Sequence, residues 1–153
     1  SNQPYQITMN TKIFIVLGAC ILLFSFWFYS RNPLSATVKI KQTEFIVDLA
    51  ITPKEKTRGL SFRKTVLPKH GMLFVYENKD KYPFWMKDMQ FPLDFVWIDG
   101  NIIVDVTKNV PPANSESMQV VKPNTPVNKI LEINAGEIDT YNIQIGDTVT
   151  FNK

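Results

Sequence analysis

The chain has little of the chemistry on which most catalytic and metal sites depend. Its 153 residues include one cysteine, Cys20, and one histidine, His70. Because Cys20 lies in an apolar run, the rest of the chain has neither a disulfide framework nor a catalytic thiol. The sequence also has no nucleophile elbow, glycine-rich phosphate loop or His/Asp cluster. We therefore expect no metal and no cofactor.

The chain also lacks a concentration of charge of one sign. Lys12 and Arg31 are the only charged residues among the first 31. Of the 17 basic and 14 acidic residues, the remainder of the chain therefore holds 15 basic and 14 acidic ones. The basic residues form no run or stripe. Nucleic-acid binding is unsupported, since it usually needs a clustered basic surface.

One long apolar run stands out near the N-terminus. Residues 13–29 read IFIVLGACILLFSFWFY, without a charge. A helix of that length reaches roughly 25 Å, the lower limit for crossing a bilayer. Trp27 and Tyr29 lie at its end, where amphipathic rings suit the headgroup zone. We expect a transmembrane anchor or uncleaved signal at 13–29, between an N-terminal tail at 1–12 and a tether at 30–36.

Other interpretations of this run stay open. A cleaved signal peptide has a similar apolar core, but Leu34-Ser35-Ala36 is a poor cleavage site. The residues before Cys20 resemble a lipobox, although the apolar run continues for nine residues beyond it. A buried helix would not be apolar on every face. The early single segment favours an exported domain outside the cytoplasmic membrane, while the positive-inside count leans toward the cytoplasm.

Residues 37–153 have the pattern of one β-rich domain. Phe45, Val47 and Leu49 fall on one face of an alternating run, as in a half-buried strand. The predicted strands are 37–40, 44–51, 71–76, 84–88, 93–98, 102–107, 129–133 and 148–151. One short helix should begin at Thr52, which can form a capping box with Glu55, and end at Gly59. The fold class predicted is mainly β: a β-sandwich or jelly-roll-like domain with one short helix, preceded by a transmembrane helix.

The densest block of the domain is Gly71–Gly100, which packs Trp85 and Trp97 between short apolar runs. Large aromatic side chains dominate the energetics of protein cores. We therefore expect both tryptophans to be core residues. In contrast, the stretch from Pro111 to Pro126 is rich in proline and polar residues, and it predicts a long loop.

These motifs resemble the domain of unknown function 192 family. The matching stretches are TPKEKTRGLSFR from Thr52, GMLFVY from Gly71, FWMKDMQFPLDFVWID from Phe84, LEINAG from Leu131 and IGD from Ile145. They cover nearly all of the domain in the family's order. The resemblance implies a jelly-roll-like β fold with one short helix, often after a signal or anchor, and no established activity. Ser61 stands where the family usually has Met, and Asp88-Met89 where it usually has Asn-Thr, so the role of that amide is in doubt.

Charged residues within apolar strands suggest a ligand site. An ionised group among apolar neighbours must be paired or face solvent. We hypothesise a polar pocket in which Arg63 and Lys87 face Asp94 and Glu132, with Trp85 stacking on a small polar or carbohydrate ligand. In the alternative interpretation, these pairs only tie the helix and loops to the sheet. A hydrolase or lyase using Asp94, Glu132 and Arg63 is another candidate, but paired carboxylates need a set separation.

Methionines form a second constellation. Met72, Met86 and Met89 offer thioether ligands that suit Cu(I), and Trp85 could shield a bound cation. A soft-metal carrier is therefore a third candidate function. The spacing matches no metal motif, however, and methionine is also a common filler of cores.

Overall fold

The computed structural model describes residues 14–23, 34–113 and 120–152, in two units that divide after Pro33. In the first unit, residues 14–23 are helical. None of the helices that the structure describes is long and apolar enough to cross a membrane. The predicted segment 13–29 extends beyond the described residues at both ends, so its full length stays a prediction.

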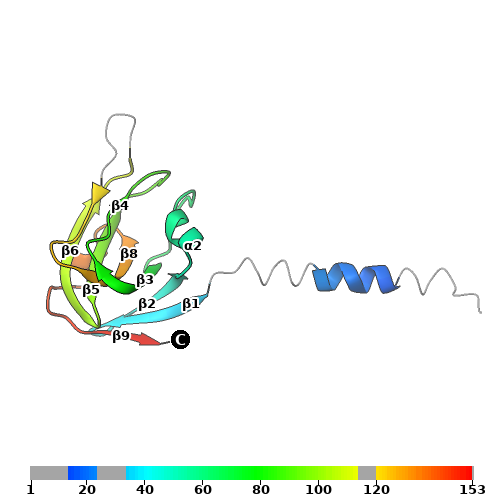
Figure 1. Cartoon of the computed structure of the whole chain (residues 1–153), viewed down its shortest axis with the longest axis horizontal. Coiled ribbons are helices and arrows are strands. Elements are labelled where there is room, and N and C mark those ends of the chain that lie inside the picture. Colours follow the sequence, from blue (N-terminus) through cyan, green and yellow to red (C-terminus); the bar gives the residue numbers. More distant parts are fainter. Residues whose placement is uncertain (1–13, 24–33, 114–119, 153) are drawn as a thin grey trace, which may run out of the picture. The chain divides into compact units, whose positions relative to one another are not determined.

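The second unit, Leu34–Lys153, is mainly β, as predicted (Figure 1). Seven strands form one sheet in the order β6-β5-β8-β3-β2-β1-β9, and β4 pairs separately with β7. The elements are β1 (Ser35–Ile40), β2 (Thr43–Ala50), α2 (Pro53–Arg58), β3 (His70–Asp80), β4 (Phe84–Trp85), β5 (Leu93–Asp99), β6 (Ile102–Val110), β7 (Val120–Val121), β8 (Val127–Asn134), α3 (Glu137–Thr140) and β9 (Val149–Asn152). Neither β7 nor α3 was expected from the sequence.

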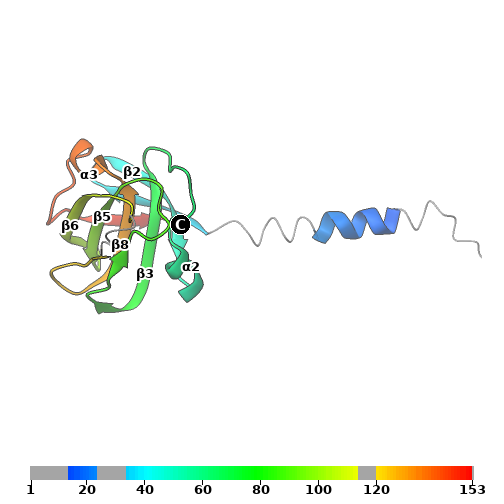
Figure 2. The same ribbon diagram turned by 90° about the horizontal axis from the view of Figure 1, so that it is seen from above.

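Strand β2 pairs in parallel with β3, and α2 lies in the crossover between them. The predicted capping box is confirmed. Thr52 Oγ1 accepts from the Glu55 N–H at 3.3 Å, and Glu55 Oε2 accepts from the Thr52 N–H at 2.8 Å. Gly59 then ends the helix with a φ of 51°, a conformation that favours glycine. Figure 2 shows α2 beside β3.

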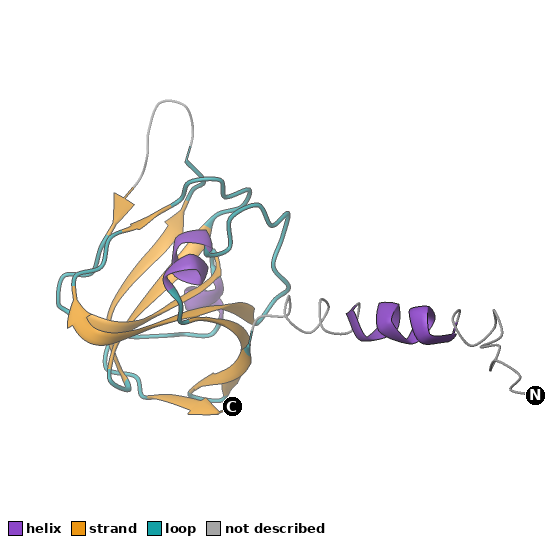
Figure 3. Cartoon of the chain, turned by 45° about the vertical axis from the view of Figure 1, so that its right-hand side comes forward, coloured by secondary structure: helices purple, strands orange, loops and turns teal. Residues whose placement is uncertain are grey.

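The large sheet curls until its two end strands meet (Figure 3). Ile102, at the start of β6, bridges Thr148, just before β9. The Ile103 N–H also donates to the Asp147 carbonyl at 3.0 Å. The structure is therefore one curled sheet with a small two-stranded partner, where the sequence predicted a sandwich of two sheets.

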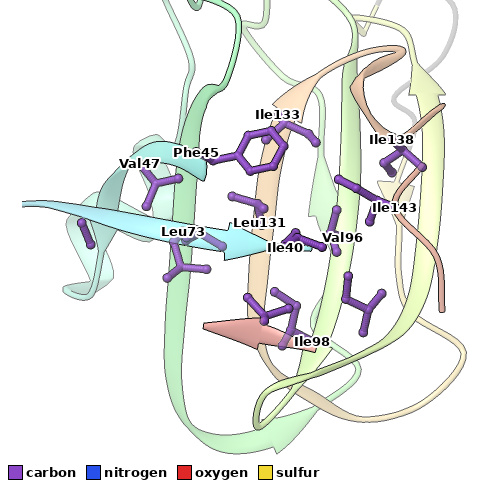
Figure 4. Packing of buried hydrophobic residues seen from close by; sticks show 14 of the residues in the cluster. Ile40, Phe45, Val47, Leu73, Val96, Ile98, Leu131, Ile133, Ile138 and Ile143 are labelled. Atoms are coloured by element: carbon purple, nitrogen blue, oxygen red, sulfur yellow. The ribbon is translucent and has the colours of Figure 1, made fainter. Parts of the chain in front are cut away.

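Two apolar cores explain why the central strands read as continuous apolar runs. Side chains alternate between the faces of a strand. On β3, Leu73 belongs to a core with Phe45, Val96 and Leu131, shown within the sheet in Figure 4. The next residue of β3, Phe74, belongs to a second core on the opposite face. Strands buried on both faces lose the alternation of polar and apolar residues.

The second core is covered by connections instead of by another large sheet. Trp97 is fully buried there, and its Nε1 donates to Thr107 Oγ1 at 2.9 Å. Leu60, after α2, and Phe84, in β4, pack into the same core. The crossover and the β4 segment therefore lie over one face of the sheet, and the cavities described below lie among them.

Candidate functional site

A cavity of about 210 Å³ lies where α2, β3 and the β4 segment meet. Its aromatic walls are Phe74, Tyr76, Phe84 and Trp85. Tyr76 stacks on Tyr82 with ring centroids 3.7 Å apart, which fixes the orientation of this wall. The polar lining comes from the end of α2 and from β8: Lys56, Thr57, Arg58, Ser61 and Glu132. An aromatic cavity with a few convergent polar groups is the usual form of a small-molecule site.

Glu132 is the buried ionisable group of this cavity. It lies in β8, opposite Met72 on β3 and Phe95 on β5, and only 5% of it is exposed. Oε2 has no hydrogen-bond partner in the described part of the chain. Burial raises the pKa of Glu132 to about 8, although the nearby Arg63 opposes the change. At neutral pH the side chain is therefore an uncharged acid that can donate a hydrogen bond.

Gly59 lies beside this acid. A Cβ at this position would lie 3.4 Å from the Phe74 ring and 4.0 Å from Glu132 Oε2. A side chain there would thus occupy space beside the carboxyl group. The same glycine ends α2, so the end of the helix and the space beside Glu132 depend on one residue.

A second cavity, of about 520 Å³, adjoins the first. The two share four lining residues, Thr57, Arg58, Ser61 and Trp85. The second cavity is also lined by Pro53, Lys54, Phe62, Lys87 and Asp88. The two cavities therefore form a composite cleft, with Trp85 and the end of α2 common to both parts.

The prediction that Trp85 is a core residue is wrong. Its side chain is 51% exposed, whereas its neighbour Phe84 is 8% exposed. The two residues alternate along β4, so only one of them can face the second core. Trp85 pairs across the strands with Val120, which is also exposed. An exposed indole at a cleft is available for stacking on a ligand.

Two residues that line the second cavity, Phe62 and Asp88, have a positive φ. Phe62 has a φ of 66° and Asp88 a φ of 58°, values that are unusual for residues other than glycine. The Phe62 N–H donates to the Asp88 carbonyl at 2.9 Å, and Ser61 Oγ donates to the Lys87 carbonyl at 3.0 Å. These bonds tie the crossover to the segment after β4 and leave the Phe62 ring 65% exposed.

The structure does not bring the four charged residues of the predicted pocket together. Asp94 faces away from Glu132, because Asp94 pairs with Ile133 whereas Phe95 pairs with Glu132. Residues opposite each other share a face, and successive residues alternate. Asp94 and Glu132 are therefore on opposite faces of the sheet, and a hydrolase or lyase built on both carboxylates is ruled out by this register.

Asp94 has a structural role. It is fully buried, and its carboxylate accepts three backbone hydrogen bonds, from Asn109 at 2.8 Å, Gly136 at 2.9 Å and Ile138 at 3.0 Å. These bonds connect β5 to β6 and to the start of α3. The carboxylate thus satisfies backbone donors that the sequence pattern did not reveal.

Arg63 pairs with a residue that the sequence analysis did not single out. Its Nη2 lies 2.6 Å from Asp48 Oδ2 on β2. Asp48 is opposite Met72, which is in turn opposite Glu132, so the ion pair and Glu132 are on the same face. Arg63 thus ties the crossover to the sheet and contributes positive charge near Glu132. Lys87, in contrast, lines the second cavity.

The methionines proposed as Cu(I) ligands lie in the second core. Met72 and Met86 are 5% and 0% exposed, and Met89 packs against them while lining the first cavity. This arrangement is the packing role that the sequence left as the alternative. His70, the single histidine of the chain, is the first residue of β3 and is half-buried.

Phe62, Tyr76 and Lys54 line the cleft but were not predicted from the sequence. Phe62 had the clearest signal in the sequence of these three. A large aromatic residue in the polar segment after Gly59 is expected to pack in a core or to contact a ligand. Lys54 and Tyr76 carry no such signal. Their contribution depends on the crossover between β2 and β3, which places α2 beside β3.

The β-rich unit is similar to other proteins. The model of the domain of unknown function 192 family (DUF192), described as "Uncharacterized ACR", matches residues 36–151. A solved structure from Sinorhizobium meliloti, described as a candidate transcription regulator, has a TM-score of 0.73 at 26% identity, covering 78% of this chain and 95% of that chain. A protein of unknown function from Novosphingobium aromaticivorans has a TM-score of 0.67 at 27% identity, covering 76% and 84%. No curated protein matches the chain. The resemblance inferred from the motifs is confirmed.

Proposed function

The chain belongs to the DUF192 family, and we propose that its β-rich domain binds a small polar ligand, with carbohydrate as the first candidate. The single observation that carries this proposal is the buried Glu132 acid, which lines an aromatic-walled cavity and has an oxygen without a partner among the described residues. Leaving a buried polar group unpaired costs free energy. A ligand hydroxyl or carbonyl at Glu132 would recover that free energy.

Trp85 supplies the second part of the proposed site. Sugar rings have apolar faces that stack on indoles, and Trp85 is half-exposed in the lining of both cavities. The ring of Phe62 is exposed in the second cavity. In this arrangement the aromatic rings stack on the faces of a sugar, and Glu132 forms a hydrogen bond with one of its polar groups.

The test is ligand-induced thermal stabilisation of the full chain in a non-ionic detergent, screened with neutral and acidic mono- to trisaccharides. We expect at least one saccharide to raise the unfolding midpoint. Trp85→Ala should raise the dissociation constant of that saccharide at least about tenfold, which is the scale of losing an aromatic contact. Glu132→Gln keeps the shape of the side chain but not the acidic proton, and it should also raise this dissociation constant.

Ile145→Ala is the matched control for Trp85→Ala. Ile145 is 62% exposed and lines neither cavity. It should leave the dissociation constant unchanged. Stabilisation by a saccharide that survives both Trp85→Ala and Glu132→Gln would refute the proposed site, and a panel with no stabilising saccharide would refute the carbohydrate class.

We also propose that residues 13–29 anchor the chain in a membrane, with the β-rich domain outside the cytoplasmic membrane. The support is the sequence: the run is uncharged, and its described part, residues 14–23, is helical. An uncharged apolar helix gains free energy from a lipid environment. An anchored domain at that surface would meet envelope saccharides, which agrees with the carbohydrate class proposed above.

A further inference from the structure

Three cations without an ion-pair partner among the described residues line the second cavity. Lys54, Arg58 and Lys87 line it, and none of them forms an ion pair with a carboxylate in the residues that the structure describes. Among the other described cations of the domain, five form such pairs (Lys39, Lys41, Arg63, Lys79 and Lys108) and six do not (Lys56, Lys64, Lys69, Lys81, Lys122 and Lys129). Asp88 is the one acidic residue in the lining of this cavity. The cavity therefore has a net positive lining in a domain whose charges otherwise nearly balance.

The acid in the adjoining cavity does not cancel this charge. Glu132 is uncharged at neutral pH because it is buried. Lys56 also lies at the first cavity, with Nζ 4.0 Å from the centre of the Tyr76 ring. An anion in the composite cleft would thus meet cations on one side and no ionised carboxylate at Glu132. Low-dielectric walls strengthen such an attraction.

The shared lining connects the positive cavity to the proposed sugar site. Arg58 and Trp85 line both cavities, so one ligand that stacks on Trp85 can reach Glu132 on one side and the cations on the other. Arg58 and the lysines would then contact a group on the same ligand as the stacked ring. Charge-assisted hydrogen bonds to such a group are stronger than those between neutral partners.

We infer that the ligand is an anionic saccharide, whose ring stacks on Trp85 and whose carboxylate lies against Lys54, Arg58 and Lys87. This inference rests on the proposed function and specifies its ligand class. Uronic-acid oligomers are the simplest saccharides of this kind. Binding should weaken with added salt, since the contact is between charges at a partly exposed surface.

The experiment compares charged saccharides with uncharged ones of the same shape. Trimers of galacturonate, mannuronate and glucuronate are titrated into the full chain in a non-ionic detergent at pH 7, each beside its methyl ester. We expect at least one acid to bind about tenfold or more tightly than its ester. The double variant Lys54→Gln/Lys87→Gln should reduce that preference to about twofold or less, because it removes two of the three cations.

The control Lys39→Gln/Lys108→Gln removes the same amount of charge away from the cleft and should keep the preference. Equal binding of acid and ester would overturn the inference while leaving the proposed sugar site intact. Failure of every acid and every ester to bind would overturn both. Citrate that competes as well as the uronate trimer would also overturn the inference, because the site would then bind anions without regard to a sugar.

Discussion

At the scale of the residue, Glu132 couples the candidate site to the stability of the domain. Its pKa is raised by burial from 4.5 to about 8. The folded chain therefore keeps a proton that the unfolded chain releases as the pH rises through this range. It follows that the contribution of Glu132 to the stability is greatest below about pH 4.5 and falls until the pH passes about 8.

Glu132→Gln should remove this pH dependence. We expect the variant to be about as stable as the parent at pH 5, and more stable at pH 9 by an amount on the order of 4 kcal/mol. The measurement is the free energy of unfolding in urea at pH 5, 7 and 9. Glu44→Gln, at an exposed position of β2, is the control and should follow the parent. A parent and a Gln variant that lose stability in parallel would show that Glu132 is ionised in the folded chain.

At the scale of the element, strand alternation assigns opposite roles to two tryptophans that the sequence treated alike. Trp97 is one of three alternate residues of β5 in the second core, with Leu93 and Phe95. β4 is only two residues long, and Phe84 takes the position that faces this core. The sequence could not assign Trp85 to either face, because a strand this short has no period to read.

Substitution of each tryptophan should separate these roles. Trp97→Ala should lower the free energy of unfolding by roughly 3–5 kcal/mol, since it removes a fully buried ring and the bond to Thr107. Trp85→Ala should lower it by less than about 1 kcal/mol, as is usual for exposed positions. Urea unfolding at pH 7 measures both. Equal losses would mean that Trp85 is as much a core residue as Trp97.

Elements with a local signal were predictable from the sequence, and those that depend on distant partners were not. The capping box at Thr52 and the helix end at Gly59 depend on residues close together in the sequence, and both predictions are confirmed. Glu132 was singled out because an acid in an apolar strand needs an explanation. The separation of Asp94 from Glu132 depends on the register of β5 against β8, which no local pattern reveals. The curl of the sheet depends on contacts between β6 and the segment before β9.

At the scale of the whole molecule, the two units call for different environments. The β-rich unit has two apolar cores of its own. Residues 13–29, in contrast, form an apolar run whose described part is a helix with large apolar side chains at most positions. We proposed a membrane as the environment of this run. The proposal can be tested without knowledge of the ligand.

The full chain should stay with the membrane pellet after an alkaline carbonate wash. Leu17→Arg/Leu22→Arg should release it, because each charge near the centre of a membrane helix costs roughly 2.5–3.5 kcal/mol on insertion scales. Leu17→Ala/Leu22→Ala keeps the run uncharged and should remain in the pellet. Protease added to spheroplasts should digest the β-rich domain if it is outside the cytoplasmic membrane. A chain that the wash extracts would contradict the anchor.

The pairing of β1 with β9 has a consequence for the order in which the domain is completed. Val38 pairs with Phe151, so the first strand of the sheet needs a partner that is synthesised more than a hundred residues later. Closing so long a loop is slow, because its entropy must be lost before the contacts form. During translation, and during any transfer through a translocation channel, β1 therefore lacks this partner until β9 emerges. Until then, the apolar core that contains Val38 and Val149 is incomplete. A nascent chain in this state can still pass through a translocation channel, and chaperones and proteases can also bind it.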